Sequence, residues 1–175
     1  MLETCQSGLT CLFAKEVCPL NGTEGSNPSV SAKMPKKVLF ICKGNMFRSQ
    51  MAMSIYNKLT DSNDSDSAGT YTGAVDEPEG QLLCNVFLTE DFFDLMELNG
   101  MNIRMNKTRR LLPEMLEEHN VVVSMAQEPY IPDFLRNDKK VIWWKVEDPK
   151  FVTAEIAKDT YEKIFKFVQG LISVE

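Results

Sequence analysis

The chain has 175 residues, a formal net charge of −6 and five cysteines. This length suits one compact domain with a sizeable core. The acidic balance argues against nucleic acid or an anionic membrane as the main partner, because both select a basic surface, and no apolar run approaches the roughly 20 residues of a membrane span. An odd cysteine count without C-x-x-C spacing indicates neither a disulfide framework nor a zinc site. We expect a cytoplasmic protein that acts as a monomer.

Residues 1–33 differ from the rest of the chain. They hold three of the five cysteines, show no sustained helical or strand period, and end in the loop-forming run NGTEGSNPSVSAK. We expect a disordered extension. A further hypothesis is spurious translation of a transfer RNA gene, because GSNP at 25–28 can be encoded by GGT TCG AAT CC, the usual T-arm sequence, and CQSG at 5–8 by a D-arm sequence. The functional protein would then begin at Met34, which the nucleotide sequence can decide.

From residue 34 onward, apolar periodicity predicts strands that alternate with helices. Gly and Asn after the first strand mark a tight loop, and β-branched residues mark the later strands. In chain order the expected elements are a strand at 38–42, a helix from 48 to about 60, a strand at about 65–69, helices at 89–100 and 113–118, a strand at 121–125, a short helix at 129–136, a strand at 141–144 and an amphipathic helix from 153 to about 171. This order predicts an α/β fold, a parallel sheet with helices on both faces.

The loop after the first strand, CKGNMFRS at 42–49, carries the residues with chemistry. Gly44 and Asn45 allow left-handed turns that aim successive N–H groups inward, and a helix begins at Arg48. Such a nest suits a phosphate dianion, and its positive field favours Cys42 as a thiolate nucleophile. Arg48 can hold two phosphoryl oxygens, and Ser49 is placed to hydrogen-bond the thiolate. The alternative is a buried, inert cysteine beside an arginine ion pair.

These residues resemble the low-molecular-weight protein tyrosine phosphatases, whose signature loop V-C-x-G-N-x-C-R-S directly follows the first strand. The likeness extends to SAGT at 67–70, to NGMNI at 99–103 and to Asp148-Pro149, so it covers essentially all of 34–175. The resemblance implies a three-layer α/β/α fold around a four-stranded parallel sheet. It also implies phosphomonoester hydrolysis through a cysteinyl-phosphate intermediate, with no metal or other cofactor.

The resemblance also implies residue roles. Asp148 would protonate the leaving oxygen and then activate the water that hydrolyses the intermediate. The expected substrate is a phosphotyrosine-containing protein or a small aryl phosphate. The expected catalytic residues are therefore Cys42, Arg48 and Asp148, and the expected substrate- or phosphate-binding residues are Lys43, Gly44, Asn45, Met46, Phe47, Ser49 and Tyr71.

Several positions depart from the family pattern. Phe47 stands where the family often has a second loop cysteine, so the disulfide that protects the nucleophile cannot form, and we expect easier irreversible oxidation. Met46 favours aryl phosphates, since phosphoarginine-specific relatives carry Thr there.

Other positions have two open interpretations. Lys43 either favours acidic substrates or is a solvated loop residue. Tyr71 either forms an aromatic wall or packs in the core. His119 is expected to be structural or exposed, and Lys150-Phe151 replace tyrosines of many relatives.

Two alternatives stay open. Arsenate reductases share the scaffold but relay a disulfide through two more cysteines, whereas from residue 34 only Cys84 accompanies Cys42. Cys84 lies in an apolar run where an inert thiol is expected, although a partner thiol could replace the relay. The other alternative is a non-catalytic phosphate-binding module, which would tolerate loss of the nucleophile or the acid. The physiological substrate stays open.

Overall fold

The computed structural model describes residues 36–86 and 88–173, so the hypotheses on residues 1–33 lie outside the described residues. Four strands form one parallel sheet in the order β2-β1-β3-β4 within these residues. The predicted α/β fold with a four-stranded parallel sheet is therefore confirmed. The strands are β1 (Val38–Cys42), β2 (Ser65–Gly69), β3 (Val121–Ser124) and β4 (Val141–Trp143).

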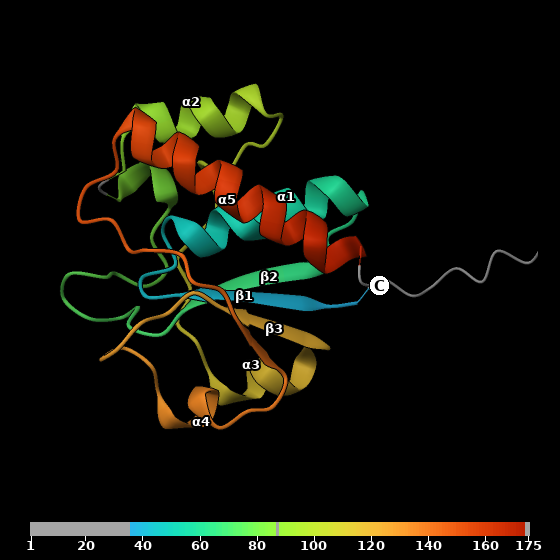
Figure 1. The fold of residues 1–175 in the computed structure, drawn as a ribbon. Helices are drawn as coiled ribbons and strands as arrows, with labels where there is room; N and C mark the ends of the chain where they lie inside the picture. The colour runs from blue at the N-terminus through green and yellow to red at the C-terminus, as the bar shows by residue number, and fades with distance from the viewer. Residues whose placement is uncertain (1–35, 87, 174–175) are drawn as a thin grey trace, which may run out of the picture. The chain divides into compact units, whose positions relative to one another are not determined.

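Helices cover both faces of the sheet (Figure 1). Successive side chains of β1 point to opposite faces, so this buried strand supplies two cores. Phe40 packs in the core shared with Ile55 and Ile164, whereas Leu39 packs in the core shared with Leu135. On the first face lie α1 (Arg48–Thr60), α2 (Glu90–Leu98) and α5 (Ala154–Ser173), and on the second lie α3 (Pro113–Glu118) and α4 (Asp133–Arg136).

The carboxyl ends of three strands converge on one edge of the sheet. Cys42 ends β1, Met125 follows β3, and residues 144–148 follow β4. Pairing is in parallel register, with Ile41 opposite Ser124, so the loops that leave these strands meet above the same edge. Ligands of open α/β sheets bind at this edge, which is where the predicted loop lies.

Some sequence expectations need correction. The helix expected at 129–136 is shortened to α4, because Pro132 has no N–H and restricts the residue before it. Ile142 and Trp143 are exposed, since β4 is an edge strand. The apolar setting expected for Cys84 is wrong. Its thiol is exposed in the short 3₁₀ helix η1 (Leu83–Asn85), and the neighbouring Leu83 fills the core instead.

Of the two alternatives expected for His119, structural or exposed, the structure supports the structural one. Its ring is buried, with Nδ1 2.6 Å from the Met115 carbonyl oxygen and Nε2 3.1 Å from Asp66 Oδ2. The hydrogen bond with Asp66 raises the pKa of His119, outweighing burial, and lowers the pKa of Asp66. This pair joins the end of α3 to β2. None of the helices in the part of the chain that the structure describes has the length and apolar character to cross a bilayer.

Candidate active site

The loop between β1 and α1 curls around the sulfur of Cys42. Asn45 adopts a left-handed conformation with φ of 55°, and its backbone N–H donates to Cys42 Sγ at 3.3 Å. The left-handed turn expected at Gly44 is wrong, since the positive φ belongs to Asn45. The missing Cβ of Gly44 gives room to the Glu77 side chain, because a Cβ there would overlap its carboxylate in this conformation.

The side chain of Asn45 stabilises this loop through hydrogen bonds. Its side-chain amide donates to Ser49 Oγ at 2.9 Å, and its Oδ1 accepts from the backbone N–H of Arg109 at 2.7 Å. Ser49 Oγ lies 3.1 Å from Cys42 Sγ. Because that oxygen already accepts from Asn45, the hydroxyl proton of Ser49 is free to point at the sulfur. Asn45 and Ser49 are both fully buried. Asn45 therefore stabilises the loop, and Ser49 contacts the sulfur of Cys42.

Arg48 is the first residue of α1, and backbone carbonyl oxygens at the edge of the sheet hold its guanidinium in place. Nη1 donates to the carbonyl oxygens of Met125 at 2.8 Å and Val146 at 3.0 Å. Nη2 forms an ion pair with Asp148 Oδ1 at 2.5 Å. The arginine side chain is 2% exposed and the aspartate side chain 39% exposed. The sheet edge therefore fixes the cation, while its carboxylate partner lies at the surface of the site.

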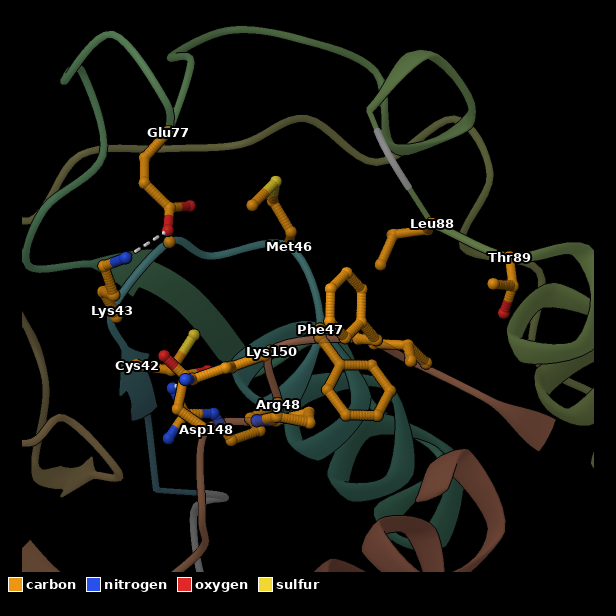
Figure 2. A pocket seen from close by; sticks show the side chains of 14 residues that line it. Cys42, Lys43, Met46, Phe47, Arg48, Glu77, Leu88, Thr89, Asp148 and Lys150 are labelled. Atoms are coloured by element: carbon orange, nitrogen blue, oxygen red, sulfur yellow. Dashed lines mark ion pairs between the residues drawn. The ribbon is translucent and has the colours of Figure 1, made fainter. Parts of the chain in front are cut away.

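A cavity of about 340 Å³ opens above these groups (Figure 2). One part of its wall is polar and includes Cys42, Arg48 and Asp148. The other part is apolar, and its Phe47 ring packs edge-on against Phe92 at a centroid distance of 4.9 Å. The apolar part of the wall consists of Met46, Phe47, Leu88, Pro149, Phe151 and Val152, and the remaining lining residues are Lys43, Gly44, Glu77, Thr89 and Lys150.

Lys43 is neither a solvated lysine nor an unopposed charge at the mouth. Its Nζ lies 2.9 Å from Glu77 Oε1 and sits over the rings of Tyr130 at 4.7 Å and Tyr71 at 5.4 Å. Burial would lower the pKa of Lys43, but the hydrogen bond and charge of Glu77 outweigh it, so the pKa is raised. Tyr71 is not among the residues that line the cavity; its ring packs on Tyr130 at 4.7 Å.

The structure brings together most of the predicted site. Cys42, Arg48 and Asp148 share one cavity with Lys43, Gly44, Met46 and Phe47. Sequence reasoning missed Glu77 and Leu88, which come from the irregular segments before α2 and carry no periodic signal. Within residues 36–86 and 88–173, no group of three or more histidine, cysteine, aspartate and glutamate side chains is arranged to hold a metal ion.

Comparisons with known proteins agree with this architecture. Residues 37–173 match the sequence family described as low molecular weight phosphotyrosine protein phosphatase. A search of curated proteins found no match. A low molecular weight protein tyrosine phosphatase from T. tengcongensis is 24% identical, with a TM-score of 0.62 over 81% of this chain and 100% of that chain.

Two further solved structures share the fold. An arsenate reductase in the phosphate binding state is 22% identical, with a TM-score of 0.60 over 79% of this chain and 98% of that chain. The YwlE arginine phosphatase, a protein of Bacillus subtilis, is 19% identical, with a TM-score of 0.61 over 77% of this chain and 91% of that chain. At these identities the likenesses establish the fold and leave the substrate to the residues of the site.

Proposed function

Because the chain belongs to the low molecular weight phosphotyrosine protein phosphatase family, we propose that it is a protein tyrosine phosphatase that hydrolyses aryl phosphomonoesters through a cysteinyl-phosphate intermediate. The observation that carries this proposal is the convergence of Cys42, Arg48 and Asp148 on a single cavity with an apolar wall. A nucleophile, a phosphate-binding cation and a proton donor are the groups that phosphoryl transfer to a thiolate requires.

In the first step the phosphoryl group binds in the loop, with its oxygens facing Arg48 and the loop N–H groups. Cys42 Sγ attacks phosphorus, the bond from phosphorus to the aryl oxygen breaks, and Asp148 gives its proton to that oxygen. The phosphoryl dianion takes the place on Arg48 Nη2 that Asp148 holds in the free protein. The carbonyl contacts of Nη1 keep the guanidinium in place during this exchange.

In the second step the Asp148 carboxylate removes a proton from a water molecule, whose oxygen attacks phosphorus. The bond from phosphorus to sulfur breaks, and inorganic phosphate and the Cys42 thiolate result. Ser49 donates its hydroxyl proton to the leaving sulfur in a hydrogen bond, as its 3.1 Å distance to Sγ allows. The thiolate is a better leaving group because of this bond.

The apolar wall supports an aryl leaving group. Met46, Phe47 and Leu88 line the cavity to one side of Cys42 (Figure 2), and such apolar surface stabilises a phenyl ring through burial. On these three side chains a guanidino leaving group would meet only the thioether sulfur of Met46, which is a weak hydrogen-bond acceptor. We therefore propose a phosphotyrosine-containing protein as the physiological partner.

Hydrolysis of an aryl phosphate by purified protein tests the proposal. Wild type should be active, Cys42→Ser should be inactive, and Asp148→Asn should lose about 10²- to 10⁴-fold in kcat. Cys84→Ser is the matched control, because this exposed thiol lies outside the cavity lining. Inactive wild type, or undiminished hydrolysis by Cys42→Ser, would refute the proposal.

The alternatives are tested in the same experiment. Arsenate reduction needs a second thiol, and faster arsenate reduction than phosphate-ester hydrolysis would favour the reductase. A phosphoarginine peptide cleaved faster than a phosphotyrosine peptide would shift the substrate class. Binding of phosphate without turnover of any substrate would indicate a non-catalytic module. Capture of phosphoproteins with Cys42→Ser then identifies the partner.

A further inference from the structure

Glu77 places a carboxylate in the wall of the cavity. The residue lies in the loop after β2 and is 7% exposed. One oxygen, Oε1, is 2.9 Å from Lys43 Nζ. The other, Oε2, is buried without a hydrogen-bond partner among the described residues. A carboxylate oxygen that is removed from water without a donor is unfavourable, so a donor supplied by a ligand would be stabilised there.

The surroundings of Glu77 are acidic. Asp76 and Glu79 flank it and are exposed, and residues 70–80 contain no lysine or arginine. Lys43 is the nearby cation, but Glu77 and two tyrosine rings already hold its ammonium group. The Lys43–Glu77 pair carries no net charge, so this side of the cavity offers a substrate a carboxylate oxygen as acceptor and no free positive charge. The expectation that Lys43 favours acidic substrates loses its physical basis.

We propose that Glu77 is a specificity-determining residue that selects phosphorylated segments with an arginine or lysine next to the phosphorylated side chain. This inference rests on the proposed phosphatase function. A carboxylate offers several acceptor sites on two oxygens, so it can bind Lys43 and a substrate cation together. Because Oε2 is buried in the free protein, rotation about the soft terminal torsion of Glu77 must bring this oxygen into the cavity, which the residue lines.

The position of Glu77 fits this role. Figure 2 shows its carboxylate pointing down to the loop beside Lys43, on the side of the cavity away from Leu88 and Thr89. The apolar wall would hold the aryl ring, while Glu77 would meet the residue that precedes or follows it. Gly44 lets the carboxylate come this close to the loop, because any side chain there would overlap it.

Paired phosphotyrosine peptides test the inference. Two peptides differ only in arginine or glutamate on both sides of the phosphotyrosine, and kcat/KM is measured for each. Wild type should prefer the arginine peptide roughly tenfold, the factor given by about 1.4 kcal/mol, within reach of one charge-assisted hydrogen bond. Glu77→Gln should bring the ratio close to one. Glu79→Gln is the matched control and should keep the ratio, since Glu79 does not line the cavity.

A second variant tests the inference even where Glu77→Gln fails to fold. Lys43→Met removes the internal partner of Glu77, so it should increase the preference for the arginine peptide. Ratios are compared within one variant, so a general loss of activity cancels. Equal turnover of both peptides by wild type, or an unchanged ratio in Glu77→Gln, overturns the inference and leaves the phosphatase function standing. Failure of wild type to hydrolyse either peptide overturns the function itself.

Discussion

Replacement of Asn45 by alanine should unfold the phosphate loop and destabilise the protein. Three side-chain hydrogen bonds are lost: the one donated to Ser49 Oγ and the two accepted from Arg109 N and Gln50 Nε2. These groups are buried or partly buried, so each loss costs about 1 kcal/mol. Alanine at a φ of 55° adds about 1 kcal/mol of backbone strain. The free energy of unfolding should therefore fall by roughly 4 kcal/mol.

Asn45→Gly separates the two contributions. Glycine loses the same hydrogen bonds but tolerates the left-handed conformation, so it should be about 1 kcal/mol more stable than Asn45→Ala. Asn99→Ala is the control, because its side chain donates a single, partly buried hydrogen bond at the end of α2, whose loss should cost only about 1 kcal/mol. Urea unfolding of the full chain measures all three. The reasoning fails if Asn45→Ala is no more destabilising than Asn99→Ala.

Three further outcomes are expected. After peroxide treatment, reductant should restore little activity, because Phe47 leaves Cys42 without a neighbouring loop thiol; full recovery would contradict this. The coupling of His119 and Asp66 in a double-mutant cycle should be about 0.5 kcal/mol at about pH 5.5 and smaller at about pH 9. The stabilisation from the raised histidine pKa is present below the ordinary histidine pKa and is lost as pH rises through the folded-state pKa. Equal coupling at both pH values would contradict this prediction. Gly44→Ala should change kcat/KM for a small aryl phosphate by less than about tenfold, because the added Cβ meets only the end of the flexible Glu77 side chain, which can turn aside. A loss of about hundredfold would show that the loop itself is displaced.

The local sequence pattern was enough to predict much of the fold and the loop that holds the nucleophile. The run at 38–42 is apolar throughout because β1 is buried on both faces, and α1 begins at Arg48 as its spacing predicts. Cys42, Arg48 and Ser49 are separated by few residues, so the strand, loop and helix place them without help from distant segments. Asp148 required the family resemblance, since an Asp-Pro pair by itself marks only a turn.

The features that could not be predicted from the sequence depend on contacts between residues far apart in the chain. Lys43 meets Glu77 and Tyr130 across a large sequence separation, and no local period reports such contacts. The exposed thiol of Cys84 shows the same limit, because an apolar run does not reveal which side chain faces the core. The structural role of Gly44 is the room that it gives to a distant carboxylate, whereas local turn chemistry predicted a left-handed conformation.

The contrast between Arg48 and Asp148 explains how one ion pair can serve the proposed reaction. Arg48 keeps its place through two carbonyl oxygens that belong to the sheet edge, so exchanging its carboxylate partner for a phosphoryl dianion requires no rearrangement of the guanidinium. The Asp148 side chain, by contrast, is partly exposed, so its carboxylate can exchange the arginine for water. In the proposed reaction, binding of the phosphoryl group would therefore also release the Asp148 carboxyl group from Arg48 for its exchange of protons with the leaving oxygen and with water.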